Sequence, residues 1–404
     1  MTLDELRALQ DPEVLSLIAG HVHDDPAAFA MRFHGRKELP VRAMAEQIAC
    51  RRKASAKLPS LSRHPLLYTQ LALEQASGER AARWKSGLMQ GRSLVDLTGG
   101  LGIDSIFFSS RFDRVVYCER DETLARIAEY NRQILGITNV ETRTGDSVEL
   151  LGSFSDDTFD WLYVDPARRE EGRRSVGLEA TSPDVVALHD QMLRKARRVC
   201  IKASPALEIS GLREKLPGLV EVIVVSVDRE CKEILLLLER GVTGEHPVTV
   251  RAVCLDDREF EVVSSTGAPG DRVVALHAGQ WLYEPDAAII KARLAAELAT
   301  RLGLEFLNHT VDYLTSDRFI GKFPGRTFHI VESLPFKPKN FRKDLARRGV
   351  TGASIQRRDF PLSPEQLRKQ YRLGESSEVF LFFTRDARGE LVYLICRKPG
   401  RAAQ

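Results

Sequence analysis

The sequence predicts an α/β fold built on an open, mostly parallel seven-stranded sheet, preceded by a helical region and followed by small α+β domains. Between residues 93 and 240, short β-branched runs alternate with helical segments, which is typical of a parallel sheet covered by helices. The last two runs are only five residues apart, too close for a crossover helix, so they must pair antiparallel. A chain of 404 residues also exceeds what one hydrophobic core usually supports.

The first part of the chain, residues 1–65, is expected to be helical. Apolar residues recur at three- and four-residue spacing, beginning with Leu3, Leu6 and Leu9. The basic stretch 51–57 ends this region before Pro59, and it is either a phosphate contact or a solvated helix end. The strands expected next, within a sheet domain at 66–240, are Ser93–Leu97, Arg114–Glu119, Val140–Thr144, Asp160–Val164, Val199–Ala203, Glu221–Val227 and Glu233–Glu239.

Two small α+β domains, residues 241–325 and 326–404, are expected to follow. In the first, a hairpin over 248–255 and 259–264 precedes a strand at 281–286 and a helix near 287–302. The elements expected in the second are strand 327–333, helix 338–348, strand 353–357, helix 364–371 and strands 377–384 and 391–397.

The composition is that of an ordinary globular protein. Hydrophobic residues make up 43% and charged residues 28%, with a net charge of +3, which argues against disorder. The N-terminus is charged and amphipathic, and no stretch approaches 18 uninterrupted apolar residues, so we expect a cytoplasmic protein. Six scattered cysteines without metal-ligand spacing predict reduced thiols and no metal site.

A glycine-rich turn follows the first strand of the sheet. The run Asp96-Leu97-Thr98-Gly99-Gly100-Leu101-Gly102 leads into an apolar helix. Glycine lets the backbone pass close to a ligand, and the start of a helix offers unpaired N–H groups. A dinucleotide-binding turn would have a third glycine or alanine at position 105, where this chain has Ser105. The turn therefore predicts a ligand site and argues against a dinucleotide.

Acidic residues stand at three consecutive strand ends. Asp96 begins the glycine turn, Glu119 closes the second strand, and Asp146 closes the third. Open α/β sheets bind ligands at the carboxyl ends of their strands, so these side chains should line one crevice. There Glu119 can accept the ribose hydroxyls of a nucleoside, and Asp146 is placed for the adenine amino group. The alternative is that Glu119 and Asp146 only cap the helices that follow.

A proline turn, Asp165-Pro166-Ala167-Arg168-Arg169, follows the fourth strand. Proline removes an N–H and fixes the turn, so the neighbouring carboxylate and carbonyl oxygens can point into the crevice. Such oxygens can accept hydrogen bonds from a substrate amine and position it for reaction. The arginines that follow suit a phosphate-rich substrate, and a solvated charged loop is the alternative; they are Arg168, Arg169, Arg173 and Arg174.

These motifs resemble those of class I S-adenosylmethionine-dependent methyltransferases, which have a Rossmann-like sheet. The resemblance extends over nearly the whole chain to a bacterial family with ferredoxin-like and THUMP-like C-terminal domains. Outside the sheet it is carried by residues 73–77 with Lys85, by 283–286 and by 336–339. It implies S-adenosyl-L-methionine as cofactor. It implies cofactor contacts from Asp96, Thr98, Gly99, Gly100, Gly102, Asp104, Glu119, Arg120, Asp146 and Ser147, and catalytic roles for Asp165, Pro166 and Arg168.

Two departures from known motifs limit which substrate atom can accept the methyl group. Enzymes that methylate nucleic-acid amines usually carry Asn/Asp-Pro-Pro and an aromatic residue, where this chain has Ala167 and Arg168. Asp-Pro-Ala-Arg is also similar to the motif of enzymes that methylate carbon 5 of uridine, which need a cysteine nucleophile. Ala203 stands in the nucleophile's place, and Cys200 lies three residues upstream. We expect a nitrogen acceptor, with a ribose oxygen as the open alternative.

The C-terminal residues 326–404 predict a nucleic-acid surface. They contain 17 Lys and Arg against 8 Asp and Glu. THUMP-like domains are associated with RNA modification, so the resemblance implies RNA, either tRNA or rRNA, as the partner. A helix face should carry Lys339, Arg342 and Lys343, with Phe336 and Phe341 in the core. The residues expected to contact substrate are Gln75, Ser77, Arg169, Lys202, Arg347, Arg348, Arg357 and Arg358.

An RNA methyltransferase is thus the expected function. The alternatives are a non-catalytic RNA-binding or assembly factor that retains the pocket, and a methyltransferase for small molecules. Lys202 stands at the end of the fifth strand, where it either contacts a substrate phosphate or is simply exposed to solvent, and the sequence favours neither alternative.

Overall fold

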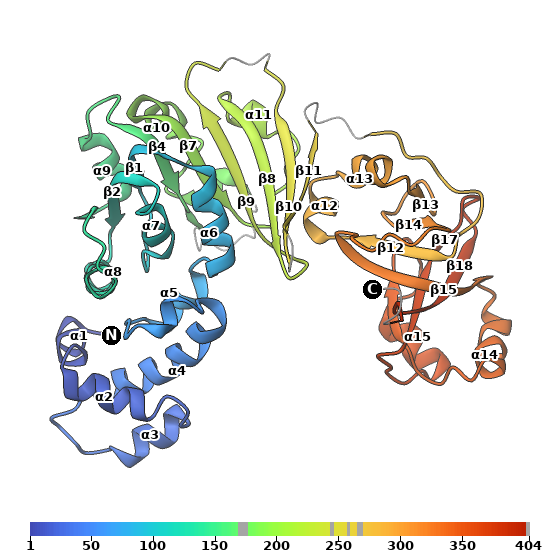
Figure 1. The fold of residues 1–404 in the computed structure, drawn as a ribbon, viewed down its shortest axis with the longest axis horizontal. Helices are drawn as coiled ribbons and strands as arrows, with labels where there is room; N and C mark the ends of the chain where they lie inside the picture. Colours follow the sequence, from blue (N-terminus) through green and yellow to red (C-terminus); the bar gives the residue numbers. More distant parts are fainter. Residues whose placement is uncertain (169–176, 243–245, 257–258, 265–269, 401–404) are drawn as a thin grey trace. The chain divides into compact units, whose positions relative to one another are not determined.

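The computed structural model describes residues 1–168, 177–242, 246–256, 259–264 and 270–400. Contacts between residues divide the chain into two compact units. The first contains residues 1–222 and 232–248, and the second contains residues 223–231 and 249–404. Figure 1 follows the chain through both units, from blue at the N-terminus to red at the C-terminus.

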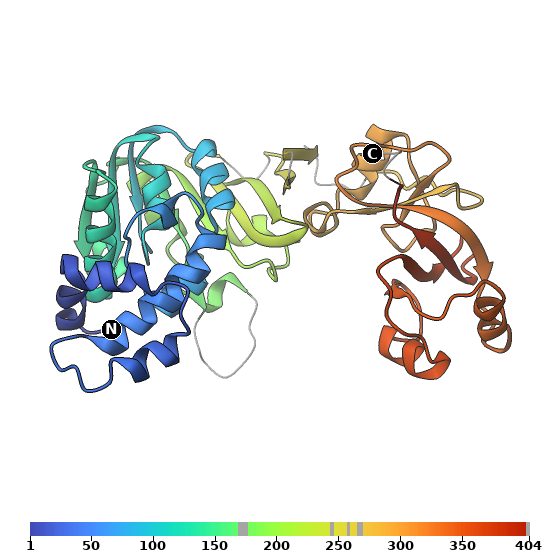
Figure 2. The ribbon, with the colours of Figure 1, turned by 60° about the horizontal axis from the view of Figure 1, so that its bottom comes forward.

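The first unit begins with four helices that share a hydrophobic core. They are α1 (Leu3–Leu9), α2 (Pro12–Gly20), α3 (Pro26–Arg32) and α4 (Val41–Lys57). Asp11 and Asp25 accept backbone N–H groups at the starts of α2 and α3, and a proline supplies the first helical residue of each. This core continues to Ile106 and Ile127 of the sheet domain. In Figure 2 these helices (blue) accordingly lie beside the sheet of their own unit.

A mostly parallel sheet forms the centre of the first unit. Its strands are β1 (Gly91–Asp96), β2 (Phe112–Glu119), β3 (Val140–Thr144), β4 (Phe159–Val164), β7 (Ala196–Ala203), β8 (Leu219–Val227) and β9 (Glu230–Glu239). Residues 223–231, which include parts of β8 and β9, belong to the second unit. Their order is β8-β9-β7-β4-β1-β2-β3. Strands β1 to β4 and β7 run parallel, while β9 runs antiparallel to β7. Beyond β8 the sheet continues with β10 (Thr249–Leu255) and β11 (Glu259–Ser264), so the structure has nine strands in this sheet. The seven predicted strands and the late antiparallel strand are confirmed within it.

Helical connections bring the carboxyl ends of the parallel strands to one edge of the sheet. The helices of this part are α5 (Gln70–Gln75), α6 (Glu79–Leu88), α7 (Ile103–Phe108), α8 (Glu122–Ile134), α9 (Ser147–Ser153), α10 (His189–Lys195) and α11 (Leu212–Lys215). After β4, the short strands β5 (Ala167–Arg168) and β6 (Thr181–Ser182) pair antiparallel. This edge is where ligands bind in open α/β sheets.

The second unit contains a hairpin and a separate seven-stranded sheet. The hairpin strands β10 (Thr249–Leu255) and β11 (Glu259–Ser264) pair antiparallel, as predicted, and β10 lies beside β8. The sheet has the order β13-β14-β12-β15-β18-β17-β16. The remaining elements are β12 (Trp281–Pro285), α12 (Ala287–Lys291), α13 (Ala295–Leu302), β13 (Glu305–Phe306), β14 (Leu314–Ser316), β15 (Gly325–Pro335), α14 (Pro338–Arg347), β16 (Ser354–Arg357), α15 (Pro364–Tyr371), β17 (Val379–Arg385) and β18 (Leu391–Arg397).

Alternate side chains of β17 enter two cores of this second sheet. Phe380 and Phe382 belong to one core, and Leu381 belongs to the other, together with Phe341 of α14. This is the period-two alternation of a strand buried on both faces. Phe336 packs on Phe341 with ring centroids 5.3 Å apart, so the prediction that these two aromatic residues belong to the core is confirmed.

The single helix predicted near residues 287–302 is two helices in the structure. Helix α12 ends at Lys291, and α13 begins at Ala295. Between them Arg293 has φ of +60°, a left-handed conformation that a continuous α-helix cannot contain. The apolar pattern of the two helices is continuous, which is why periodicity alone joined them.

Candidate active site

A cavity of about 310 Å³ lies at the carboxyl ends of the parallel strands. Its volume is in the range of cofactor sites. The wall comes from the ends of β1, β2, β3 and β4 and from the segment after α5. The predicted site residues that line it are Gln75, Ser77, Asp96, Thr98, Gly99, Gly100, Asp104, Glu119, Arg120, Asp146, Ser147 and Asp165. Most of the residues predicted for the cofactor thus surround the same cavity as the first residue of the predicted reaction loop.

The shape of the turn after β1 depends on its glycines. A Cβ at Gly99 would lie 2.0 Å from Cε2 of Tyr117, closer than any side chain allows. Gly100 has φ of +54° and no atom within 4 Å of where its Cβ would stand, so bare backbone borders the cavity there. Gly102, with φ of +73°, caps α7. Within the described residues it is not part of the cavity wall, so it shapes the turn without lining the cavity.

Asp96 holds the glycine turn in place. One of its oxygens accepts the backbone N–H of Thr98 at 3.1 Å, and the other accepts the hydroxyl of Ser105 at 2.7 Å. Its side chain is buried, and burial raises the pKa of Asp96 to about 7. Ser105, which replaces the third glycine of a dinucleotide turn, therefore has a structural partner here.

Glu119 and Asp146 contact both the backbone and the cavity. Glu119 accepts the N–H of Gly100 at 2.8 Å and that of Asp121 at 2.9 Å. Oδ1 of Asp146 accepts the N–H of Val148 at 2.8 Å and thereby caps α9. Helix capping, the alternative considered from the sequence, is therefore present at Asp146. It uses one oxygen of a carboxylate that also lines the cavity, and carboxylate oxygens can accept further hydrogen bonds.

Asp165 joins the turn after β1 to the end of β7. Its backbone N–H donates to Oγ1 of Thr98 at 2.6 Å, and its carboxylate accepts a hydrogen bond from the ammonium group of Lys202. The Asp165 side chain is 35% exposed and that of Lys202 is 13% exposed. Burial is the largest single effect and opposes the charge of Lys202, but the carboxylates of Asp165, Asp104 and Glu233 together outweigh it and raise the lysine's pKa. Lys202 is therefore not a solvated strand end.

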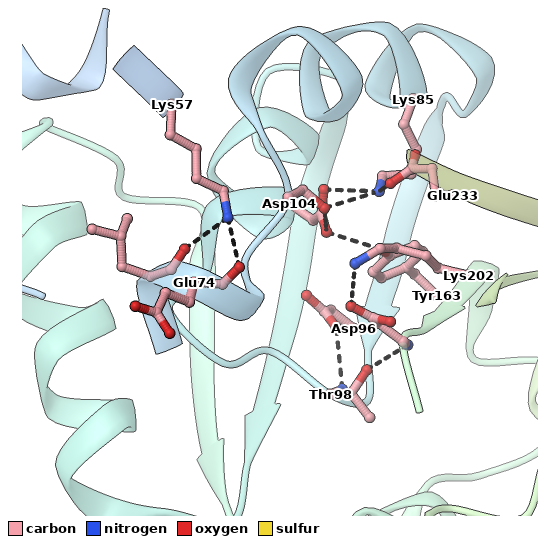
Figure 3. A network of polar contacts seen from close by, with 12 residues as sticks. Lys57, Glu74, Lys85, Asp96, Thr98, Asp104, Tyr163, Lys202 and Glu233 are labelled. Carbon is pink, nitrogen blue, oxygen red and sulfur yellow. Dashed lines mark hydrogen bonds and ion pairs between the residues drawn. The ribbon is translucent and has the colours of Figure 1, made fainter. Parts of the chain in front are cut away.

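A buried polar network that the sequence did not predict adjoins the cavity (Figure 3). The ammonium group of Lys85, fully buried, lies 3.1 Å from Oδ1 of Asp104 and 3.1 Å from Oε2 of Glu233. Oδ2 of Asp104 accepts the hydroxyls of Ser77 at 2.8 Å and Tyr163 at 2.9 Å. Burial lowers the pKa of Lys85, but the two carboxylates outweigh burial and raise it. Lys85 therefore stays charged between them.

This network uses two predicted ligand contacts. The sequence predicts cofactor contact by Asp104 and substrate contact by Ser77, and both line the cavity. In the structure, however, they bond to one another and to Lys85. No local sequence pattern predicts such a cluster, because its members come from four separate segments of the chain, at 77–85, 104, 163 and 233.

Some predicted residues have no described side-chain contact at the site. Arg169, like Arg173 and Arg174, lies outside the described residues. For Arg168 the structure describes the backbone, which pairs with Thr181. Pro166 is half-buried, and within the described chain it is not part of the cavity wall.

Two of the four predicted C-terminal arginines hold their own unit together. Arg348 donates to both oxygens of Glu332, and Arg358 donates to Glu284 at 3.3 Å. A guanidinium group that is paired with a carboxylate must give up that partner before it can bind a phosphate. The predicted contact of these arginines with RNA stays a prediction, and for Arg348 and Arg358 it requires that they leave their carboxylate partners.

A basic helix face is found on α14. Lys339, Arg342 and Lys343 are all exposed, as their predicted common face requires. Arg347, one turn after Lys343, is 72% exposed. We call these four residues the α14 basic face. Arg357 is also exposed, but its guanidinium donates to a backbone carbonyl at 2.8 Å.

The comparisons with known proteins agree with this geometry. Residues 325–398 match the family model described as THUMP domain-like. A putative methyltransferase from Porphyromonas gingivalis W83 superposes with a TM-score of 0.86 at 29% identity, over 99% of this chain and 100% of that one. This chain has the class I methyltransferase fold. It is also 28% identical to uncharacterized S-adenosylmethionine-dependent methyltransferases of two Mycobacterium tuberculosis strains, over 89% of this chain and 97% of theirs.

The cysteines of this methyltransferase fold offer no nucleophile at the cavity. Cys200 is fully buried, and burial raises its pKa far above the usual range. All six cysteines are described, and none is in a disulfide. Among the described residues, no group of side chains suited to hold a metal ion is found, and no helix is long and apolar enough to cross a membrane.

Proposed function

We propose that the chain is an S-adenosylmethionine-dependent methyltransferase that modifies RNA. The observation that carries the proposal is the cavity itself, in which the glycine turn, Glu119, Asp146 and Asp165 meet at consecutive strand ends. The relatives that align over nearly their full length are named as methyltransferases dependent on this cofactor. Both observations support the same chemistry.

The residues around the cavity fit the parts of the cofactor. Glu119 would bind the ribose hydroxyls and Asp146 the adenine amino group, since both carboxylates line the wall. The turn that Asp96 holds would receive the methionine portion, because Gly100 leaves open space beside its backbone. The cofactor supplies a methyl group on a positively charged sulfur, ready for transfer to a nucleophile.

RNA is the substrate class that the second unit supports. The THUMP-like residues 325–398 include the α14 basic face, whose side chains are exposed, and exposed Lys and Arg side chains are those that contact phosphates. A small-molecule substrate would leave this face unexplained. The acceptor is either a base nitrogen, which the sequence favours, or a hydroxyl oxygen. The preference for nitrogen assumes that the Asp165 carboxylate is free to accept hydrogen bonds from a substrate amine.

The test is nucleoside mass spectrometry of tRNA and rRNA from a strain that lacks this protein. The expected result is the loss of one methylated nucleoside, restored by the wild-type chain and not by Asp165→Ala. Calorimetry with S-adenosylhomocysteine gives an independent measurement of the cofactor site. Binding without loss of any methylated nucleoside would favour a non-catalytic RNA-binding factor or a small-molecule acceptor instead.

A further inference from the structure

We infer that the methyl acceptor is a ribose 2′-hydroxyl, held between the carboxylate of Asp165 and the ammonium group of Lys202. This inference rests on the proposed RNA methyltransferase function and decides its acceptor atom. The observation behind it is that Asp165, which lines the cavity together with Ala167 of the reaction loop, is already paired with Lys202, a lysine just outside the cavity wall in the described part of the chain.

The Asp165–Lys202 pair disfavours an amine acceptor. An amine must donate its N–H groups to acceptor oxygens and gains positive charge as nitrogen bonds to the methyl carbon. The Lys202 ammonium group competes for the Asp165 oxygen that it occupies, and it repels that developing charge. The arrangement would raise the barrier to nitrogen methylation.

The same pair suits a hydroxyl. A hydroxyl group donates one hydrogen bond and accepts others, so it can donate to Asp165 while its oxygen accepts from Lys202. Hydrogen bonds with ionised partners are the stronger kind. A nearby cation also favours the negative charge that oxygen gains as it loses its proton. In RNA, every internal nucleotide carries such a group at the 2′ position.

Neighbouring charges hold Lys202 in its protonated form. Burial is the largest single effect and lowers the pKa of Lys202, and Lys85 lowers it further, but Asp165, Asp104 and Glu233 together raise it. Lys85 lies between Asp104 and Glu233, where it balances much of their charge. Figure 3 shows this group of lysines and carboxylates around the end of the sheet. Lys202 therefore acts as a hydrogen-bond donor to the acceptor oxygen, not as a base.

The transfer balances without any further reactant. The 2′-oxygen uses a lone pair to form the new bond to the methyl carbon, and the electrons of the broken carbon–sulfur bond stay on sulfur as the neutral thioether. As the oxygen forms its bond, its proton becomes strongly acidic and passes to the Asp165 carboxylate. Asp165 then releases that proton to water. Lys202 stays charged throughout and stabilises the oxygen while it loses the proton.

The experiment locates the methyl group in the nucleoside that disappears from the deletion strain, because fragmentation separates the sugar from the base. We expect the methyl group on the sugar, and alkaline cleavage blocked at the modified nucleotide in wild-type RNA. A methyl group on the base would overturn the hydroxyl acceptor and leave the proposed function standing. Loss of no methylated nucleoside would overturn both.

Variants test the roles of the two residues on the purified chain with RNA from the deletion strain. Lys202→Ala and Asp165→Asn should lower the methylation rate by about 100-fold or more, and Lys202→Arg should recover part of it by restoring a charged donor. Affinity for S-adenosylhomocysteine, measured by calorimetry, should be unchanged in all three. Full activity in Lys202→Ala would overturn the inference.

A matched control is Lys195→Ala. The exposed fraction of Lys195, 12%, is similar to the 13% of Lys202. Lys195 pairs with Asp156 at 2.7 Å, and among the described residues Asp156, unlike Asp165, does not line the cavity. Its substitution should leave the methylation rate unchanged. An equal loss in Lys195→Ala and Lys202→Ala would show that a general structural effect is responsible and would overturn the assigned role of Lys202.

Discussion

The ammonium group of Lys85 lies 3.1 Å from the carboxylate of Glu233, although 148 residues separate the two. Lys85 belongs to α6, which precedes the first strand, and Glu233 belongs to β9, which enters the sheet between β8 and β7. Both side chains are buried. The pair therefore fastens the helix in front of the sheet to its late antiparallel strand, beside the candidate active site.

Substitution of Lys85 should destabilise the first unit strongly. In Lys85→Met, the carboxylates of Asp104 and Glu233 would be left buried without a counter-charge. Breaking a buried ion pair from one side costs about 3–5 kcal/mol. We expect a decrease of this size in the free energy of unfolding, measured by urea titration of the full chain.

Arg83→Met is the matched control on the same helix. Arg83 is 62% exposed and pairs at 3.0 Å with the buried carboxylate of Glu79, which also accepts the N–H of Ser60. An ion pair with one exposed partner is screened by water, so its loss should cost less than loss of the fully buried Lys85. The two variants should therefore differ clearly. Similar unfolding free energies would contradict the assignment of Lys85 as a central counter-ion.

The sheet and its ligand edge were predictable because both leave local patterns. Strands read as β-branched runs between helical segments, and the residue that follows each run must lie at the carboxyl edge. That is why the sequence alone places Asp96, Glu119, Asp146 and Asp165 around one site, and all four line the cavity. The same logic predicted the antiparallel strand from a connection too short for a helix.

Contacts between distant segments could not be predicted in this way. Nothing near Lys85 in the sequence points to Glu233, and nothing near Arg348 or Arg358 shows that each has a carboxylate partner. Side-chain pairing depends on which elements become neighbours, so it appears only in three dimensions. The choice between a nitrogen and an oxygen acceptor also depends on such a contact, because the sequence does not show which residue pairs with Asp165.

The stability of the first unit should depend on pH through Asp96. Burial raises the pKa of this carboxyl from 3.8 to about 7, so the folded protein keeps a proton that the unfolded chain releases. The contribution of Asp96 to the free energy of unfolding is therefore fully present below about pH 4. It decreases as the pH rises to about 7, by up to ~1.4 kcal/mol per pH unit. Above that range the contribution is lost.

Asp96→Asn should remove this dependence. The amide oxygen can still accept the N–H of Thr98, and the amide N–H can donate to the Ser105 hydroxyl, but the side chain no longer titrates. We expect a flatter unfolding free energy for the variant between about pH 4 and 7 in urea titrations at several pH values. An unchanged slope would show that other groups cause the pH dependence.

The glycine turn should tolerate no side chain at Gly99. In Gly99→Ala the new Cβ would meet the ring of Tyr117 at 2.0 Å, so the turn or the ring must move. Such overpacking costs about 1–3 kcal/mol, which corresponds to roughly ten- to hundredfold weaker binding if the turn is displaced. Calorimetry with S-adenosylhomocysteine measures this loss.

Gly87→Ala provides the comparison for that measurement. Gly87 lies in α6, and nothing stands within 4 Å of its Cβ position. Alanine should therefore preserve ligand affinity and stabilise the helix by about 0.4–1 kcal/mol. Equal affinities for Gly99→Ala and Gly87→Ala would argue that the cofactor does not bind at this turn.

The α14 basic face should account for much of the salt dependence of RNA binding. Charge reversal of Lys339, Arg342 and Lys343 to Glu removes up to three phosphate contacts. Each phosphate contact contributes about 0.7–0.9 to the slope of log K against log salt concentration, so the slope should fall by about 2. Filter binding of total tRNA at several salt concentrations measures this change.

The control for net charge is the triple reversal of Arg7, Arg32 and Arg36, which are 79%, 64% and 64% exposed on or beside the N-terminal helices. It changes the charge of the chain by the same amount at a different surface. If the α14 basic face binds phosphates locally, only the α14 variant should show a smaller slope of log K against log salt concentration. The reason is that counterion release depends on direct contacts with phosphates. Equal losses in both triples would indicate a diffuse electrostatic attraction, and no loss in either would remove the α14 basic face from the RNA surface.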